Sequence, residues 1–419
     1  MRNLLRRPSA FMMDAMPRRS NTSENSKPEV DLPSLVVNAR AVARLRAGHV
    51  WVYRSDLVSA EGVPPGAMVR VLDQKRKSLG TALYSSSSQI AIRMISSGAV
   101  PDLPALLRQR IREALAYREK VVSGTDAYRL VFSEADFLPG LIVDRYNDVL
   151  SMQVLTQGMD AETVRDSVLT TLEEQISPAG IVERMDPRVR ELEQLPPLQT
   201  RLLRGQKSET IVTMNGVHFR FRGLEGQKTG AFLDQRENYA AAAQYAHGEA
   251  LDVFCYQGGF ALHVAPRCSQ VTGVDSSRAA LEAAEENAKL NGIELEWMEG
   301  NAFDLLKDYS AAGKQYDTIV LDPPAFARSK QALNTALRGY KELNLRALKM
   351  LRPGGTLVTC SCSYHVSEAD FLETVSSSAV DAHRSLRLVE KRGQAKDHPV
   401  LLGVPETAYL KCLIFHVSH

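Results

Sequence analysis

The 419-residue sequence has no long hydrophobic run and little imbalance of charge. No apolar stretch approaches the ~18 residues that a membrane-spanning helix needs, which excludes an integral membrane protein. Lysine and arginine number 51 against 49 aspartates and glutamates, so the net charge of +2 does not by itself indicate a nucleic-acid partner. The hydrophobic share of 44% and the charged share of 24% exclude a mainly disordered, collagen-like or coiled-coil chain.

Cysteine is also scarce. An odd set of five in so long a chain excludes a disulfide framework and favours a reducing, cytoplasmic location. Cysteine and histidine do not occur at zinc-finger spacing, so we expect no metal site. The five cysteines all lie in the second half of the chain, at Cys255, Cys268, Cys360, Cys362 and Cys412.

Residues 1–31 are rich in arginine and serine but lack the apolar core of a secretory signal. We interpret them as a disordered basic extension, with an organelle transit peptide as the alternative.

The rest of the chain divides into three domains by its pattern. Short β-rich segments separated by turns predict a small β-barrel over residues 32–97. Helical and strand-like stretches predict a small mixed α/β domain over 98–208, with residues 195–208 as the linker that follows it. Over 209–419, a hairpin precedes strands that alternate with helices, which predicts an α/β domain with a parallel, doubly wound sheet.

Four successive strands of that sheet end in residues suited to a nucleotide-like ligand. The first ends at Asp252 and is followed by Gly258 and Gly259, and the second ends at Asp275, where a carboxylate is suited to hold two ribose hydroxyls. The third runs into Asn301 and the fourth into Asp322. Taken alone, the glycine pair is equally well explained as an ordinary β-to-α turn. The four loops together are much more specific, because parallel strands place their carboxyl ends at one edge.

This constellation resembles the class I S-adenosylmethionine-dependent methyltransferases, which have a Rossmann-like fold. The resemblance implies that Asp275 and Ser276 hold the ribose and that the loop of Asp252, Phe254, Tyr256, Gly258 and Gly259 cradles the methionine part. It also implies that Asn301 and Ala302 lie beside the adenine. Asn301 departs from the aspartate that is usual there, but it keeps an acceptor oxygen.

The fourth and fifth strands carry the candidate chemistry. Asp322 begins the stiff segment Asp-Pro-Pro-Ala-Phe, in which Asp322 is suited to hold the edge of a base and Phe326 to stack on it. Cys362 follows the fifth strand, whereas Cys360 lies earlier and is interpreted as a packed, small hydrophobic residue. A thiolate adding to cytosine C6 activates C5 toward methylation, a step that amino or ring-nitrogen methylation does not need. Two alternatives are that Cys362 has only a structural role, or that Cys360, Cys362 and His365 bind a metal ion.

Further motifs occur in a fixed order. They are Ser133–Leu141, Gln227–Arg236, Tyr256–Phe260, Asp322–Phe326, Arg338–Glu342, Ser361–Ser363 and Asp397–Val400. Over residues 34–418, this combination closely resembles the RlmI family of large-subunit ribosomal RNA cytosine-5 methyltransferases. The resemblance implies an N-terminal PUA domain, a small central α/β domain and S-adenosylmethionine as the cofactor. It further implies Cys362 as the nucleophile, no second catalytic cysteine at Ala325, and Phe232, Asp234 and Gln235 over the cofactor pocket. Tyr364 and His365 depart from the small residues expected after the nucleophile.

Basic and aromatic residues indicate where RNA binds. We expect Arg44 and Trp51 to contact RNA in the N-terminal domain, and Phe326, Arg328, Lys330, Arg338 and Lys341 to surround a flipped base. A solvated surface is the alternative for the N-terminal set. The expected partner is large-subunit ribosomal RNA, and a homodimer is kept as a candidate assembly.

Two other functions remain open: an RNA methyltransferase acting on guanine N7 or an exocyclic amine, and a non-catalytic RNA-binding factor in ribosome assembly. The sequence does not determine the target nucleotide, the RNA stage, the base that removes the C5 proton or the oligomeric state.

Overall fold

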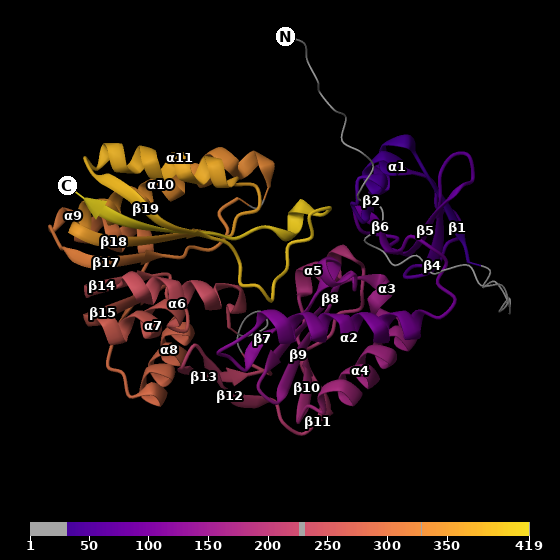
Figure 1. Ribbon diagram of the computed structural model, residues 1–419, viewed down its shortest axis with the longest axis horizontal. Helices are drawn as coiled ribbons and strands as arrows, with labels where there is room; N and C mark the ends of the chain where they lie inside the picture. The colour runs from indigo at the N-terminus through magenta and orange to yellow at the C-terminus, as the bar shows by residue number, and fades with distance from the viewer. Residues whose placement is uncertain (1–31, 226–230, 328, 419) are drawn as a thin grey trace, which may run out of the picture.

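The computed structural model describes residues 32–225, 231–327 and 329–418. The N-terminal extension that we predicted over residues 1–31 therefore lies outside the described residues. Figure 1 shows an N-terminal β-rich part at one end of the molecule, a C-terminal α/β part at the other, and a central α/β part beneath the space between them.

The N-terminal part is a six-stranded sheet in the order β2-β6-β5-β4-β1-β3. The β-rich segments predicted here are confirmed as strands, but the helix α1 and the short strand β3 were not predicted. Helix α1 begins where the side chain of Asn38 accepts the backbone N–H of Ala41, and its eight residues are too few to show a clear apolar period. The elements are β1 Ser34–Val37, α1 Ala39–Arg46, β2 Trp51–Tyr53, β3 Leu57–Ser59, β4 Met68–Leu72, β5 Ser78–Tyr84 and β6 Ile90–Ser96.

The central part is a five-stranded sheet in the order β11-β10-β9-β8-β7, packed against the helices α2 and α4. The prediction that residues 195–208 form a linker is wrong over Arg201–Gly205, because these residues pair with β10 and close the sheet as β11. The elements are α2 Leu103–Val121, β7 Ala127–Phe132, β8 Leu141–Tyr146, β9 Val149–Val154, α3 Gln157–Asp160, α4 Glu162–Ile176, β10 Gly180–Glu183, α5 Pro187–Leu192 and β11 Arg201–Gly205.

The C-terminal part is a doubly wound sheet in the order β16-β15-β14-β17-β18-β20-β19, which confirms the predicted fold class. Helices α9, α10 and α11 cover one face and α6, α7 and α8 the other (Figure 1). The strand order reverses between β14 and β17, where such sheets bind ligands. The elements are α6 Arg236–Tyr245, β14 Gly248–Val253, α7 Gly259–Val264, β15 Cys268–Asp275, α8 Arg278–Asn291, β16 Glu296–Glu299, α9 Ala302–Ala311, β17 Tyr316–Leu321, α10 Leu333–Met350, β18 Leu351–Ser361, α11 Glu368–Asp381, β19 Ser385–Arg392 and β20 Lys411–Ser418.

A hairpin of β12 (Glu209–Met214) and β13 (Val217–Arg222) joins the central and C-terminal parts. Phe221 stacks on Tyr146 of β8, with ring centroids 3.8 Å apart, and the amide oxygen of Asn287 on α8 accepts the backbone N–H of Arg220. The hairpin therefore packs against both parts at once and fixes their relative position.

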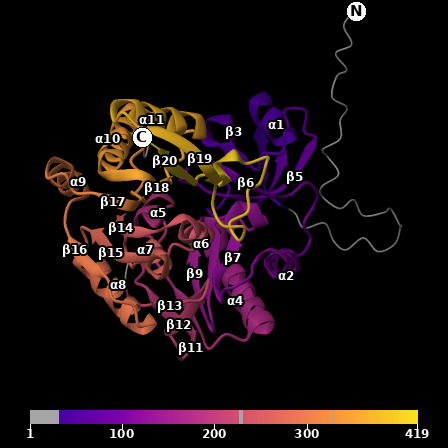
Figure 2. The same cartoon turned by 60° about the vertical axis from the view of Figure 1, so that its left-hand side comes forward.

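The loop between β19 and β20, residues 393–410, reaches back to the N-terminal part and is called the strap here. Its Val404 is fully buried in the core of the N-terminal sheet, and its Glu406 lies 3.3 Å from the His49 ring nitrogen. Asp397 pairs with the buried guanidinium of Arg236 at 3.2 Å and accepts a backbone N–H from β7. Figure 2 shows this loop lying against the N-terminal sheet. The strap thus ties all three parts together.

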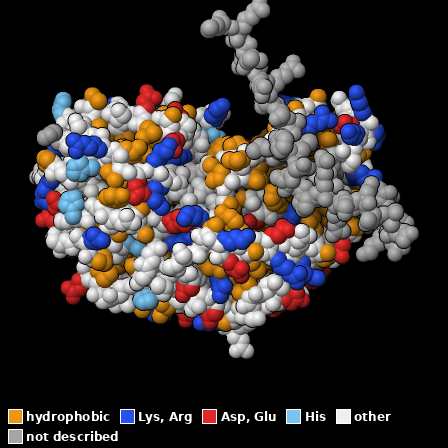
Figure 3. Space-filling model, viewed as in Figure 1, with side chains coloured by type: hydrophobic (Ala, Val, Ile, Leu, Met, Phe, Trp, Pro, Cys, Tyr) orange, Lys and Arg blue, Asp and Glu red, His pale blue; other side chains and the backbone are white. Residues whose placement is uncertain are grey.

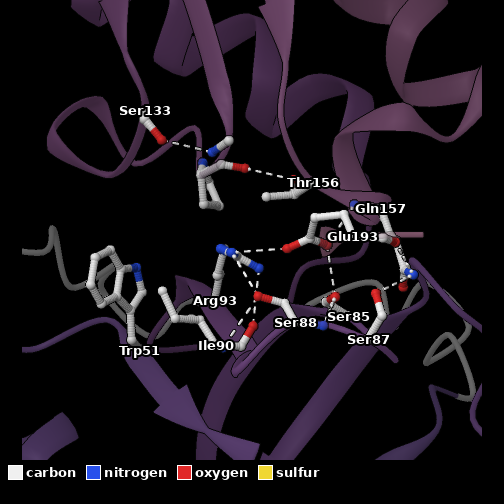
Figure 4. Close-up of polar contacts among 12 residues, drawn as sticks. Trp51, Ser85, Ser87, Ser88, Ile90, Arg93, Ser133, Thr156, Gln157 and Glu193 are labelled. Atoms are coloured by element: carbon white, nitrogen blue, oxygen red, sulfur yellow. Dashed lines mark hydrogen bonds and ion pairs between the residues drawn. The ribbon is translucent and has the colours of Figure 1, made fainter. Parts of the chain in front are cut away.

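A buried polar network also joins the N-terminal and central parts (Figure 4). Arg93 on β6 lies 3.1 Å from the carboxylate of Glu193, which is only 3% exposed. The same carboxylate accepts the backbone N–H of Gln157. The indole N–H of Trp51 donates to Glu134 at 3.0 Å, and the Arg93 Nε lies 3.5 Å from the same oxygen. Arg93 therefore forms ion pairs with two carboxylates of the central part, Glu134 and Glu193.

The Arg93→Met substitution tests this network. Removal of the guanidinium leaves the buried carboxylate of Glu193 without its cation, so we expect the free energy of unfolding to fall by about 3 kcal/mol. Urea-induced unfolding followed by tryptophan fluorescence measures the change. Arg204→Ala, which removes an exposed partner of Glu173, is the matched control and should cost less than about 0.5 kcal/mol. Equal effects of the two variants would show that the network is not an anchor.

Candidate functional site

The carboxyl ends of the parallel strands meet in the middle of the molecule, facing the N-terminal part (Figure 1). The surface is indented between the C-terminal and N-terminal parts in Figure 3. Asp252 is the last residue but one of β14, Asp275 ends β15, Asp322 follows β17 and Cys362 follows β18. The structure therefore brings together, at one edge of the sheet, the four residues on which the predicted site depends.

The loop after β14 has an unusual backbone. Phe254 and Tyr256 adopt positive φ angles of 68° and 48°, and Gly258 follows at 83°. Non-glycine residues pay about 1–3 kcal/mol each for such conformations, which is typical of functional sites. The tight turns bring the Tyr256 N–H within 3.0 Å of the carboxylate of Asp275.

The two glycines of this loop serve packing. A Cβ on Gly259 would lie 2.5 Å from the ring of Tyr239, and one on Gly258 would lie 3.1 Å from Trp297. The positive φ of Gly258 also starts α7. Close approach to a ligand, which we expected from the sequence, is therefore not needed to explain either glycine.

Asp275 presents both carboxylate oxygens in a fixed orientation. One oxygen accepts from Tyr256, and the other accepts the backbone N–H of Ser277 at 2.9 Å. Each oxygen keeps a second acceptor position. Ser276 is exposed beside it. The arrangement is suited to a pair of neighbouring hydroxyl groups.

Asp252 is fully buried at the centre of the edge. One oxygen accepts the backbone N–H of Ala261, and the other has no hydrogen-bond partner among the described residues. Burial, with smaller contributions from Asp322 and Asp275, raises the pKa of Asp252 to about 8, against the hydrogen bond from Ala261. Three carboxyl groups thus crowd one edge, which makes the edge suited to a cationic ligand.

Asp322 is held by a chain of amide side chains. The amide of Gln235, in the 3-10 helix η3 (Leu233–Gln235), donates to Asp322 at 2.9 Å. The Gln235 oxygen accepts from Asn238, whose own oxygen accepts from Arg392. Because both ends of the Gln235 amide are used, its structural role is to orient Asp322.

Asp234 and Phe232 lie beside the same edge. Asp234 accepts the phenolic proton of Tyr409 at 2.6 Å, and Phe232 packs edge-to-face on Tyr256 at 5.0 Å. The predicted contacts of Phe232, Asp234 and Gln235 with a cofactor stay predictions, and the segment 226–230 before them lies outside the described residues.

Asn301 has a structural role that the sequence did not show. Its side-chain oxygen accepts the backbone N–H groups of Phe303 and Asp304 and so caps α9. That oxygen is the acceptor we expected to meet an adenine amino group, so the cap competes with the predicted contact. Ala302 is buried in the first turn of α9.

Cys362 is partly exposed at the mouth of the edge. Its thiol donates to the carbonyl oxygen of Pro323, 3.8 Å away, in the loop that Asp322 begins. β17 and β18 are paired neighbours, so their following loops meet. Cys360, two residues earlier, is fully buried, which confirms its interpretation as a packed residue. No group of three or more potential metal ligands occurs among the described residues.

The side chains predicted to contact RNA near the flipped base differ in their surroundings. Phe326 packs on Tyr340 at a ring distance of 4.8 Å, and Lys330 and Arg338 are exposed near the start of α10. Lys341 is paired with Asp381 of α11 at 2.8 Å, and its contact with RNA stays a prediction. Arg328 lies outside the described residues.

In the N-terminal part, the predicted RNA contacts already have protein partners. Arg44 pairs with buried Asp56 at 2.9 Å and covers the ring of Tyr53. Trp51 belongs to the network that joins the N-terminal and central parts. Contact of either residue with RNA stays a prediction.

The strand order, the loop after β14 and the acidic edge define an S-adenosylmethionine-dependent methyltransferase. Residues 141–416 match the family model described as S-adenosylmethionine-dependent methyltransferase, and residues 35–97 match that of a PUA-like domain. S-adenosylmethionine is thus the cofactor, and its positive charge fits the three carboxyl groups and the unpartnered Asp252 oxygen.

The chain belongs to the family of ribosomal RNA large subunit methyltransferase I. The protein of that name from Shewanella denitrificans is 38% identical over 385 residues, which cover 89% of this chain and 96% of the relative. The Photobacterium profundum protein of the same name is 37% identical, with the same coverage.

Two solved structures share the fold. A methyltransferase designated SMU.776, complexed with SAH, superposes with a TM-score of 0.79 at 20% identity, over 92% of this chain and 100% of that one. An S-adenosylmethionine-dependent methyltransferase from Streptococcus mutans gives 0.78 at 19% identity with the same coverage. None of the helices in the described part of the chain has the length and apolarity to cross a membrane.

The raised pKa of Asp252 makes a prediction about stability. Between pH 4 and pH 8 the folded chain keeps a proton on Asp252 that the unfolded chain releases, so this residue lowers stability as the pH rises through that window. Asp252→Asn resembles the protonated acid. We expect the ligand-free variant to gain stability over the wild type toward pH 8 and to match it near pH 4.

Urea-induced unfolding at pH 4.5, 6 and 8 measures this difference, with Asp308→Asn on the exposed side of α9 as the control. A constant difference between Asp252→Asn and wild type at all three pH values would contradict the prediction.

Proposed function

We propose that this protein methylates C5 of a cytosine in large-subunit ribosomal RNA, with Cys362 as the covalent nucleophile. The observation that carries the proposal is the partly exposed thiol of Cys362 in contact with the Asp322 loop, at the carboxyl edge of a methyltransferase sheet. The names of the curated relatives support the ribosomal substrate. That substrate and the lack of a disulfide among the described residues favour a cytoplasmic protein.

Cytosine C5 is a poor nucleophile and has to be activated before it can accept a methyl group. Cytosine C5 gains reactivity when the Cys362 thiolate forms a bond to C6 and the C5–C6 double bond becomes part of an enamine. S-adenosylmethionine, when bound, would supply the methyl group to which C5 forms its new bond, and the bond from that group to sulfur would break to leave the neutral thioether. Loss of the C5 proton then restores the C5–C6 double bond as the bond between C6 and sulfur breaks, which returns Cys362 as a thiolate.

Asp322 is suited to the base in this reaction. Its carboxylate is fixed by Gln235 and lies in the loop that the Cys362 thiol contacts. We propose that it binds the amino group of cytosine and shares a proton with N3. The negative charge that the ring gains on accepting the thiolate is then neutralised by that proton at N3. The target nucleotide has to be single-stranded or flipped out, because a thiolate cannot reach C6 in a stacked base.

Asp275, Asp252 and the loop after β14 are proposed to hold the cofactor. Asp275 binds the two ribose hydroxyls with its spare acceptor positions, and Asp252 lies at the cationic part with its unpartnered oxygen.

Cys362→Ala tests the nucleophile. We expect methylation of ribosomal RNA to fall below detection while affinity for S-adenosylmethionine, measured by calorimetry, stays unchanged. The control is Cys268→Ala, a half-buried cysteine at the start of β15, which should keep full activity. An RNA in which 5-fluorocytidine replaces the target should form an adduct stable in denaturing gels, because the fluorine cannot leave as a cation.

Full activity of Cys362→Ala would refute the covalent mechanism. Bisulfite sequencing of the RNA before and after methylation then separates the alternatives. Methylation at guanine or at an exocyclic amine adds no 5-methylcytosine to the RNA. Absence of S-adenosylmethionine binding to folded wild-type protein would favour the non-catalytic assembly factor.

Asp275→Ala tests the cofactor assignment. Loss of hydrogen bonds between hydroxyl groups and a charged acceptor costs about 1.5–3 kcal/mol, so we expect affinity for S-adenosylmethionine to fall about 10- to 100-fold. Calorimetry measures it, with Glu282→Ala on the exposed face of α8 as the control. Affinity equal to that of the control would place the ribose elsewhere.

A further inference from the structure

Lys411 is a buried cation in contact with the loop that follows Cys362. It is the first residue of β20 and pairs in register with Ser361, the last residue of β18. Only 8% of the residue is exposed. The sequence around it reads as an apolar strand, so nothing in the pattern marked Lys411 as functional.

The ammonium group of Lys411 donates three hydrogen bonds, all to backbone carbonyl oxygens. It donates to the oxygens of Ser363 at 2.7 Å, Val366 at 2.8 Å and Tyr409 at 2.9 Å. Ser363 and Val366 bound the loop that follows Cys362. The lysine therefore fastens that loop to β20 through two of its three bonds.

A second set of hydrogen bonds holds the other side of the same loop. The Tyr340 hydroxyl accepts from the Ser361 side chain and bonds the Ser363 side chain, both at 3.0 Å. The Ser363 oxygen also accepts the backbone N–H of Ala327 at 3.2 Å. Cys362 thus lies between two residues that are both fixed, and Lys411 supplies the only cation of these clamps.

The charge of Lys411 is not cancelled where it lies. Among the described residues it forms no ion pair with a carboxylate within 4 Å, and neutral carbonyls solvate a cation without neutralising it. Burial lowers the pKa of Lys411 to about 8, while the nearby Cys362 and then Glu368 raise it. A side chain with this pKa is mostly charged at neutral pH.

Other titratable groups also lie around Cys362 and Lys411 in the described part of the chain. Tyr340 of α10 and Tyr409 of the strap interact with Cys362, Asp322 lies in the loop that its thiol contacts, and Glu368 of α11 interacts with Lys411. Burial raises the pKa of both tyrosines, so they are neutral, and a carboxylate at Asp322 disfavours a thiolate. Among these groups, Lys411 alone favours the anion.

We propose that Lys411 is a positioning residue for Cys362: its ammonium group fixes the loop after the cysteine and stabilises the thiolate form of its side chain. The proposal rests on the proposed function, in which Cys362 is the nucleophile. It accounts for a lysine buried in an otherwise apolar strand, where it would be costly without such a role.

The experiment measures Cys362 alkylation by iodoacetamide in the full-length protein between pH 5.5 and 9.5, with mass spectrometry of the Cys362 peptide. In Lys411→Met we expect the midpoint of the pH profile to rise by at least one unit and the rate at pH 7 to fall at least 10-fold. Lys411→Arg should restore most of the rate. Cys268, half-buried at the far end of β15, is the internal control and should keep its profile.

Lys411→Gln separates charge from hydrogen bonding, because its amide still donates to the carbonyls, and it covers the case in which the methionine variant does not fold. A folded Lys411→Gln protein with the wild-type profile would overturn the proposal. A shifted profile without a 5-fluorocytidine adduct would refute the proposed function alone, and an adduct with an unshifted profile would refute the role of Lys411 alone.

Discussion

The crowding of three carboxyl groups at one edge of a parallel sheet is the constraint on which the site depends. Parallel pairing of β14, β15 and β17 forces Asp252, Asp275 and Asp322 together, and burial raises the pKa of Asp252 to about 8. Such an edge costs stability in the ligand-free chain and is compensated by a cation. A sulfonium cofactor supplies that positive charge, so the crowding of the carboxyl groups favours binding of this class of ligand.

The proposed nucleophile needs the opposite electrostatics at the same edge. A thiolate at Cys362 is disfavoured by Asp322, whose loop its thiol contacts. Lys411, proposed to stabilise that thiolate, comes from the antiparallel strand β20, which pairs with β18. The edge is therefore divided between an acidic half for the cofactor and a thiol half backed by a buried cation.

The strap connects this site with the N-terminal part. Val404 is buried in the N-terminal sheet. Tyr409, near the end of the strap, contacts Asp234, and Lys411, directly after the strap, contacts the loop that follows Cys362. The Arg93–Glu193 network fixes the same N-terminal part to the central one. The PUA-like domain is thus held in a set orientation toward the carboxyl edge of the catalytic sheet.

The alternation of strands and helices and the residues at the strand ends determined the fold class and gathered Asp252, Asp275, Asp322 and Cys362, because both signals are local. Periodicity did not reveal α1 or β11, because a helix of eight residues and a strand of five are too short for a clear pattern. Nor could it show that the Asn301 oxygen caps α9, that Gln235 orients Asp322, or that Lys411 stands behind Cys362. Those facts depend on which segments distant in the chain pack side by side, and only the tertiary structure decided that.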